Sequence, residues 1–514
     1  MRQKPFLPGD ENLLRKEFQN VSRVQSLWDQ SPDSAQKLED ILHSLKDPFH
    51  AIALLKDGRT LKGSELFTLG HLAFSVNRAL MVLNDTYWVP WPARCVPPSL
   101  QTVEKRLMPG SSGQPSFYVA DSYSAELAKA RAQRKQKERQ WRYAMDEEAQ
   151  AVEDLLGKRP GLREEIAVRK SDRRLVEKAR LMPELGEIRE TLTHVHFRLK
   201  ASGEAVTIER EISRLRQREL ALEEEVMADL SRELRPTAES FERAAWALGE
   251  LDWLLCKAHL AREWDAVVPQ VLGDAGVCLQ LEGAIHPIVR EIVQGRGGRF
   301  QPVSISLSEP VTVITGPNMG GKTVALQILG LMVTLAQWGF LVPCTSMSFS
   351  LFDFVYLQPQ SPGKPGLSSF AAEIVALKEP LAMKGQKGLI LLDEIGRGTN
   401  PSQGMALYAA LLQYLGQTEG NTSRVVATTH YHGLTRLIPA EHWQVAGLRL
   451  SPERDMPGDN GDPESGLQWL YEHMDYGLQK VGPETPAPRD ALLVASLLGL
   501  DREIIEIAES FCRP

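Results

Sequence analysis

The feature that most constrains the fold is a glycine-rich turn between a strand-like and a helix-like stretch. Residues 316–323 are Gly-Pro-Asn-Met-Gly-Gly-Lys-Thr and fit the pattern G-x-x-x-x-G-K-[ST]. The apolar run 311–315 precedes this turn, and a helix-like run over 324–335 follows it. Glycines in this context let backbone N–H groups approach phosphate oxygens closely. The pattern therefore predicts a phosphate-binding loop in an α/β domain.

Every residue of this turn is a candidate ligand of a nucleotide. Lys322 would neutralise the β- and γ-phosphates, and the hydroxyl of Thr323 would bind Mg²⁺. We therefore expect ATP and Mg²⁺ as cofactors. The predicted nucleotide ligands in the turn are Gly316, Pro317, Asn318, Met319, Gly320, Gly321, Lys322 and Thr323.

Two carboxylates end a second apolar stretch. Residues 389–392 are Leu-Ile-Leu-Leu, and Asp393 and Glu394 follow directly. Phosphoryl transfer needs a carboxylate for the metal and a group that polarises the attacking water. We predict Asp393 as a metal ligand and Glu394 as the general base. Taken alone, such acids also fit a simple transition from strand to loop.

A third strand-like run, 425–429, ends in two hydroxyl side chains and is followed by His430. We expect His430 to sense or orient the γ-phosphate, which makes Glu394, His430 and Lys322 the predicted catalytic set. Phe300 precedes the phosphate loop and is a candidate for stacking on adenine. An ordinary core phenylalanine explains it equally well.

The rest of the chain predicts a helical region with an extended arm. At 514 residues the chain exceeds the size of one ordinary core. Apolar spacing predicts a helical hairpin over 41–83 with a turn at 56–59, and Ser64 is placed to cap its second helix. Long charged helices are expected over 122–156 and 203–234, the second continuing towards Ala261. Between them, shorter segments predict a compact insert at the tip of an arm.

These observations predict a multidomain fold, with an α-helical core and arm region followed by an α/β P-loop NTPase domain of the ABC type. Residues 1–110 would form the helical N-terminal part of the core, and 111–275 the arm and its return. Strand and helix patterns alternate from about 277, which predicts a largely parallel sheet in a domain over 276–514.

Charge does not decide the partner. The formal net charge of −7 is unlike the basic surface typical of proteins that bind nucleic acids. The stretch 129–142 is nevertheless strongly basic. It could contact phosphates, or it could be a solvated helix face balanced by the acidic stretch that begins at Asp146.

Membrane association is not expected. No run approaches the roughly 20 apolar residues that a spanning helix needs, and the N-terminus lacks the apolar region of a secretory signal. Five scattered cysteines without a C-x-x-C pair favour reduced thiols. We therefore expect a cytoplasmic protein.

Three segments resemble the MutS family of DNA mismatch repair-type ATPases. T-G-P-N-M-G-G-K-T at 315–323 resembles its Walker A motif, and L-L-D-E-I-G-R-G-T at 391–399 resembles its Walker B motif and D-loop. A-T-T-H-Y at 427–431 is similar to its histidine switch. The resemblance covers about 280–440, and 490–508 is similar to the family's dimerising helical segment.

The resemblance implies a homodimer with ATP held between two copies of the C-terminal domain. Residues 366–373 are similar to the family's G-x-S-T-F-M-x-E segment, which implies that Ser368 reaches the γ-phosphate bound by the other subunit. Ser368 could equally be a helix N-cap. The implied function is ATP hydrolysis coupled to clamping of mismatched, branched or distorted DNA.

The sequence also departs from the family. It contains no F-x-E tripeptide and offers no room for mismatch-recognition and connector domains, which puts direct mismatch sensing in doubt. Thr323-Val-Ala-Leu is similar to the branch that acts outside mismatch repair, yet we expect no space for that branch's nuclease domain. Residues 400–404 lack the usual acidic residue before the D-loop glycine.

Two other functions remain open. Short MutS-like chains are associated with adenosylcobalamin-dependent aminomutases, so the chain could be an ATP-dependent factor that reactivates such a protein partner without a role on DNA. A scaffold that binds ATP without hydrolysing it is the least favoured option, because Lys322, Asp393, Glu394 and His430 are all present.

Overall fold

The structure is a computed structural model. It describes residues 4–108, 118–157, 159–160, 165–201, 203–273, 279–295, 298–316, 321–359, 369–383, 385–396, 400–417, 423–431, 433–448, 474–482, 491–497 and 500–512.

The chain divides into two compact units, each built from separate segments. Unit 1 contains residues 1–39, 85–93 and 250–514. Unit 2 contains residues 40–84 and 94–249. The N-terminal segment thus belongs to the same unit as the α/β region. The predicted boundaries at 110 and 275 stay predictions.

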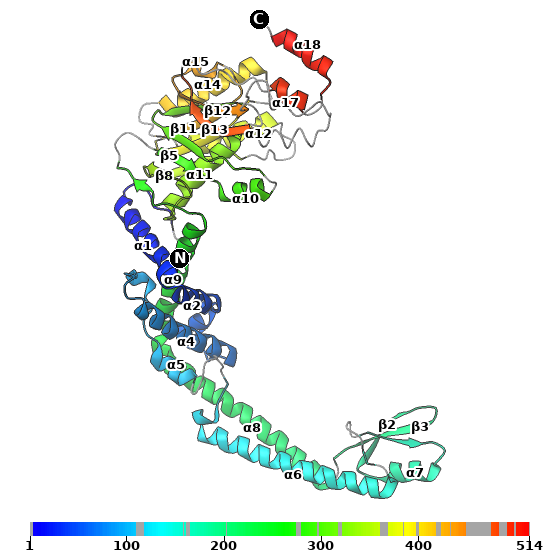
Figure 1. Ribbon diagram of the computed structural model, residues 1–514. Coiled ribbons are helices and arrows are strands. Elements are labelled where there is room, and N and C mark those ends of the chain that lie inside the picture. The colour runs from blue at the N-terminus through cyan, green and yellow to red at the C-terminus, as the bar shows by residue number, and fades with distance from the viewer. Residues whose placement is uncertain are drawn as a thin grey trace. The chain divides into compact units, whose positions relative to one another are not determined.

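The main element of unit 1 is a sheet that, within the described residues, has six strands (Figure 1). All neighbours pair in parallel except β13 with β12, which confirms a largely parallel sheet. The strands in sheet order are β13 (Met474–Lys480), β12 (Glu441–Leu448), β7 (Val311–Thr315), β11 (Arg424–Thr429), β10 (Gly388–Asp393) and β9 (Phe354–Leu357).

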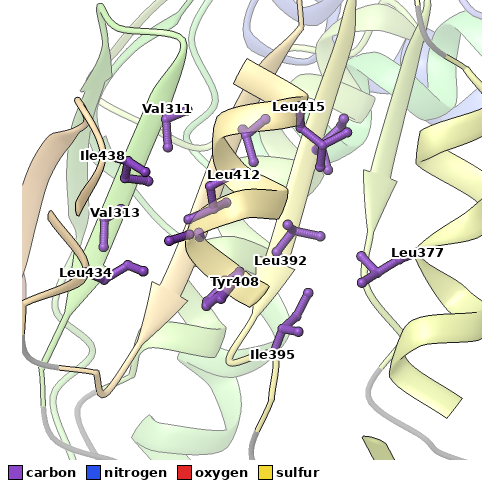
Figure 2. Packing of buried hydrophobic residues seen from close by; sticks show 14 of the residues in the cluster. Val311, Val313, Leu377, Leu392, Ile395, Tyr408, Leu412, Leu415, Leu434 and Ile438 are labelled. Carbon is purple, nitrogen blue, oxygen red and sulfur yellow. The ribbon is translucent and has the colours of Figure 1, made fainter. Parts of the chain in front are cut away.

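Helices cover both faces of this sheet, which explains why β10 is apolar at every position from 389 to 392. On one face, Tyr408, Leu412 and Leu415 of α14 (Pro401–Gln417) pack against alternate strand residues (Figure 2). On the other face lies α11 (Lys322–Gln337), because a Cβ on its Gly330 would lie 3.0 Å from Leu391 Cδ1. Alternate residues of β10 therefore serve two helix layers.

A smaller sheet of unit 1 was not predicted as a separate sheet. Its order is β4-β8-β5-β6, and its inner pairs β8-β5 and β5-β6 are antiparallel. The expected strand near 277 corresponds to β5, which is described from Leu279 onward. The strands are β4 (Gln270–Val271), β8 (Ser346–Phe349), β5 (Leu279–Ala284) and β6 (Val303–Leu307).

The far end of α11 meets the helical part of unit 1 at a buried junction. Lys257 of α9 (Ala238–Glu263) donates to Glu17 Oε1 of α1 (Glu11–Gln30) over 2.9 Å, and both side chains are buried. The Gln337 amide donates to the carbonyl of Phe6 (3.0 Å). The helix that begins at the phosphate loop is thereby tied at its other end to the N-terminal segment, and Gly339 just beyond it lies against Glu17 and Lys257.

Unit 2 contains an apolar helix that differs from two predictions. By length and composition α4 (Gly63–Asp85) could cross a membrane, contrary to our reading of the sequence, but 67% of its most apolar window is buried. Its apolarity therefore reflects core packing. Ser64 is not the N-cap, because α4 already begins at Gly63 and the Glu65 carboxylate accepts the Lys62 N–H (2.6 Å).

The two long charged helices that the sequence predicts are present in unit 2. Helices α6 (Ala125–Leu156) and α8 (Gly203–Leu234) lie side by side and carry a small domain at one end (Figure 1). That domain, which we call the tip, has the sheet order β1-β3-β2 and one helix. Its elements are β1 (Glu165–Arg169), α7 (Arg173–Leu181), β2 (Leu185–Glu190) and β3 (His194–Leu199).

Three cationic residues of the basic stretch of α6, Arg131, Arg134 and Lys137, are paired with acids of α8. Arg131 donates to Glu219 (2.9 Å) and Glu223 (2.5 Å), and Arg134 also donates to Glu219 (2.7 Å). These carboxylates raise the pKa of Arg131 despite its partial burial. For these residues the structure favours an ion-paired helix face over a phosphate-contacting one.

The remaining described helices are α2 (Pro32–His43), α3 (Phe49–Lys56), α5 (Gln101–Leu107), α10 (Pro287–Gly295), α12 (Ser369–Ala376), α13 (Lys378–Ala382), α15 (Leu434–Leu437), α17 (Ala491–Leu497) and α18 (Arg502–Cys512), with short 3-10 turns η1 (Ala93–Cys95), η2 (Asp121–Tyr123) and η3 (Arg235–Thr237).

Candidate nucleotide site

The candidate site lies where three parallel strands end together. Strand β11 lies between β7 and β10, with Thr429 opposite Thr315 and Thr428 opposite Asp393. The carboxyl ends of parallel strands form the edge where α/β proteins bind ligands. The three segments that the sequence analysis singled out therefore meet at one edge of the sheet.

The two described glycines of the phosphate loop have backbone geometry that requires glycine. Gly316 has φ +145°, and a Cβ there would lie 2.9 Å from Val445 Cβ. Gly321 has φ +76°, and a Cβ would lie 3.0 Å from Tyr476 Cδ1. Positive φ and close packing both exclude a side chain. This fits a phosphate cradle; the predicted ligands at positions 317–320 lie outside the described residues.

Lys322 and Glu394 form a buried ion pair beside the loop. Their Nζ and Oε1 atoms are 2.8 Å apart, and their side chains are only 2% and 3% exposed. The ammonium also donates to the carbonyl of Gly316 (2.8 Å). The predicted phosphate-binding cation and the predicted general base thus lie in direct contact in a site from which water is largely excluded.

Thr323 and Asp393 provide oxygen atoms suited to Mg²⁺. The hydroxyl of Thr323 donates to Asp393 Oδ2 over 2.8 Å, and the hydroxyl of Thr428 donates to Oδ1 over 2.6 Å. Among the described residues no group of three or more His, Cys, Asp or Glu side chains could hold a metal. Such a sparse set fits Mg²⁺, which takes few protein ligands and completes its shell with phosphate oxygens and water.

Glu394 has an unusual backbone conformation. Its φ is +48°, in the left-handed region that costs a residue other than glycine about 1–3 kcal/mol. Its N–H donates to both the hydroxyl (3.1 Å) and the carbonyl (3.2 Å) of Thr428. The neighbouring strand therefore holds the acidic residue in a strained turn, as is common at functional sites.

His430 lies on the other side of Glu394, with 3.9 Å between its Nδ1 and Glu394 Oε2, and is 42% exposed. It can therefore face both a bound phosphate and the buried acid. Phe300 is partly buried, and its neighbour Gln301 accepts the N–H of Tyr476 (2.7 Å), whose ring lies against Gly321. This brings the segment of Phe300 near the loop. Ser368 lies outside the described residues.

Several residues of the site were missed by the sequence analysis. Gln358 accepts the N–H of Asp393 (2.9 Å), and the hydroxyl of Tyr408 donates to the carbonyl of Thr428 (3.1 Å). Burial, and next the negative charge of Asp393, raise the pKa of Tyr408 well above its ordinary value, so it stays a donor. No pattern in the sequence distinguishes these positions from ordinary strand and helix residues.

Comparison with known proteins agrees with this geometry. Residues 312–460 match the family described as MutS domain V, and this stretch contains Lys322, Asp393, Glu394 and His430. This part of the chain is thus similar to the MutS family's domain V, an ATPase domain, which bears out the expected resemblance and agrees with the expected class of enzyme.

Relatives in the MutS family match about half of the chain. Endonuclease MutS2 of Carboxydothermus hydrogenoformans is 32% identical over 60% of this chain and 36% of its own length. DNA mismatch repair protein MutS of Shouchella clausii is 32% identical over 43% of this chain and 25% of its own length. The chain thus spans about a third or less of these relatives.

Proposed function

We propose that this chain binds ATP with Mg²⁺ at the ends of β7, β10 and β11 and hydrolyses it there. The main support for this proposal is that four side chains lie in contact beside the phosphate loop: Lys322, Thr323, Asp393 and Glu394. Lys322 binds phosphate oxygens, and Thr323 and Asp393 hold Mg²⁺, which neutralises charge that develops on the phosphates. Glu394 accepts a proton from the attacking water, and His430 orients the γ-phosphate.

We propose further that two copies enclose the nucleotide. Helix α18 supports this, because Ile504, Ile507 and Phe511 recur at i, i+3 and i+7 and are 50%, 51% and 83% exposed. An exposed apolar stripe of this kind is typical of a protein interface. A second copy is the partner that the MutS resemblance implies, with Ser368 contributed across the interface.

The proposed cargo is DNA, held through the arm. One face of the tip sheet carries two arginines: Arg169 pairs with His194 across β1 and β3, and Arg189 pairs with His196 across β2 and β3. Paired residues share a face, and it is opposite the one where Phe197 is buried. A cationic surface suits a phosphate backbone. The names of the relatives favour DNA over an aminomutase partner.

Hydrolysis is tested by Glu394→Gln. We expect phosphate release to fall by about 100-fold or more, since general-base catalysis contributes about 10²–10⁴-fold. Binding of a fluorescent ATP analogue should persist, because Lys322 and the loop are intact. Glu309→Gln, an exposed acid next to the same sheet, is the control. Equal turnover in the wild type and Glu394→Gln would remove the assigned base.

A further inference from the structure

The backbone of Gly396, two residues after Glu394, is held by side chains from two other elements. Its N–H donates to Glu373 Oε2 of α12 over 2.9 Å. Its carbonyl accepts the hydroxyl of Tyr431, which follows β11, also over 2.9 Å. Both hydrogen-bonding groups of one residue are therefore fixed from outside its own segment.

The space around Gly396 admits no side chain. Its φ is +91°, and a Cβ would lie 3.2 Å from Tyr431 Oη and 3.3 Å from the Cα of Gly404 at the start of α14. The turn after Glu394 is thus packed against three elements. Since Glu394 itself has φ +48°, this packing opposes relaxation of the strained turn.

We propose that Glu373 and Tyr431 are positioning residues for ATP hydrolysis, which hold the turn 394–396 so that the Glu394 carboxylate stays aligned with the attacking water. The proposal rests on the proposed function. General-base catalysis depends on alignment within hydrogen-bond reach, so a displaced turn slows the chemical step while leaving the phosphate loop intact.

The same contacts join the turn to both predicted γ-phosphate sensors. Tyr431 follows His430 directly, and their rings are 4.6 Å apart. Glu373 lies on α12, which comes just after the segment expected to reach the partner's nucleotide. A shift of Tyr431 together with His430 would therefore act on Gly396 and, through it, on Glu394.

The chemistry of the two hydrogen bonds is consistent with this role. Burial, and secondarily the nearby Glu373 carboxylate, raise the pKa of Tyr431 above its ordinary value. The phenol therefore remains protonated at neutral pH and donates to the Gly396 carbonyl. An amide oxygen at position 373 would still accept the Gly396 N–H.

The test compares steady-state turnover and nucleotide affinity in Glu373→Ala, Glu373→Gln and Tyr431→Phe. We expect kcat to fall about 10- to 100-fold in Glu373→Ala and Tyr431→Phe, with KM for ATP and analogue affinity within about twofold of wild type. Glu373→Gln should retain most of the turnover. The effects of the two changes on kcat should be less than multiplicative in the double variant Glu373→Ala/Tyr431→Phe, because both changes release the same residue, Gly396.

Tyr123→Phe is the matched control. Its hydroxyl donates to the carbonyls of Arg106 (2.9 Å) and Leu107 (3.2 Å), so the change removes the same kind of hydrogen bond in unit 2 without touching Gly396 or α12. We expect near wild-type kcat. Thermal melting of each variant identifies loss of folding. If one of the variants Glu373→Ala and Tyr431→Phe melts early, the other one is used in the comparison.

The outcomes separate this inference from the function on which it rests. If Glu394→Gln abolishes turnover while Glu373→Ala and Tyr431→Phe retain wild-type kcat, the positioning role is wrong and the ATPase assignment stands. A rise in KM with unchanged kcat likewise overturns positioning in favour of nucleotide binding. Absence of ATP turnover in the wild type would overturn the proposed function itself.

Discussion

Single residues at the nucleotide site are stabilised by contacts that the chain makes before any ligand binds. The charge of Lys322 is balanced by Glu394, and its ammonium also donates a hydrogen bond to a backbone carbonyl. The Asp393 carboxylate accepts hydrogen bonds from two hydroxyl groups. A buried charge without such partners would cost several kcal/mol. The site is therefore preorganised, and the exposed His430 is the member that faces solvent most.

A residue-scale prediction concerns the pH dependence of stability. Burial, and next the charge of Lys46, lower the pKa of His71 below 6.5 in the folded protein. As pH falls below about 6.5, the unfolded chain takes up a proton that folded His71 still excludes, so stability falls. His71→Gln should weaken the loss of melting temperature between pH 7.5 and 5.5. An equal effect of the exposed control His50→Gln would contradict this assignment.

At the scale of elements, the tip domain shows how one sheet serves two purposes. Val195, Phe197 and Leu199 of β3 are buried with α6, α7 and α8, whereas His194, His196 and Arg198 alternate with them on the other face. One strand thereby anchors the tip to the arm and presents polar side chains outward. A one-residue slip in register would exchange these faces, so the buried residues fix which side chains face outward.

The prediction at this scale concerns DNA binding. Arg169→Gln and Arg189→Gln should each weaken binding to duplex DNA and reduce the slope of log affinity against log salt by about 1, as expected when one phosphate contact is lost. Arg174→Gln is the control, since it removes the same charge from α7 on the far side of the sheet. Equal effects at all three positions would indicate general electrostatic attraction instead of a specific face.

At the scale of the molecule, unit 1 joins its two ends through α11. This helix begins at Lys322 in the nucleotide site and ends at Gln337, which is tied to the N-terminal segment and lies next to the Glu17–Lys257 junction. A rigid helix holds its two ends at a fixed separation. We therefore expect α11 to transmit a displacement at the phosphate loop to α1 and to the α9 residues of unit 1.

Assembly gives the prediction at this scale. Ile507→Asp places a charge in the exposed apolar stripe of α18 and should shift the protein towards monomer, because burial of that stripe would then desolvate a carboxylate. Sedimentation with and without ATP measures this. Leu437→Asp introduces the same charge at another exposed aliphatic residue and should leave the oligomeric state unchanged. Equal dissociation in both would remove α18 from the interface.

The sequence alone determined the phosphate loop, both carboxylates and the two-helix arm. These depend on local spacing: a strand, a glycine turn and a helix are contiguous, and uninterrupted helix formers specify α6 and α8. Clustering of Lys322 with Glu394 was also predictable, because parallel strands place their carboxyl ends at one edge. The predicted roles of Phe300 and Ser368 remain predictions.

Only the tertiary structure decided the contacts between residues far apart in the chain. The two hydrogen bonds to Gly396 join positions 373, 396 and 431, none of which has a local sequence signature. The Glu17–Lys257 ion pair joins residues that are 240 positions apart. The same holds for Arg131 and Arg134 of the basic stretch, because only the packing of α6 against α8 shows which acids they meet. Local pattern specifies an element, whereas packing alone specifies which side chains meet.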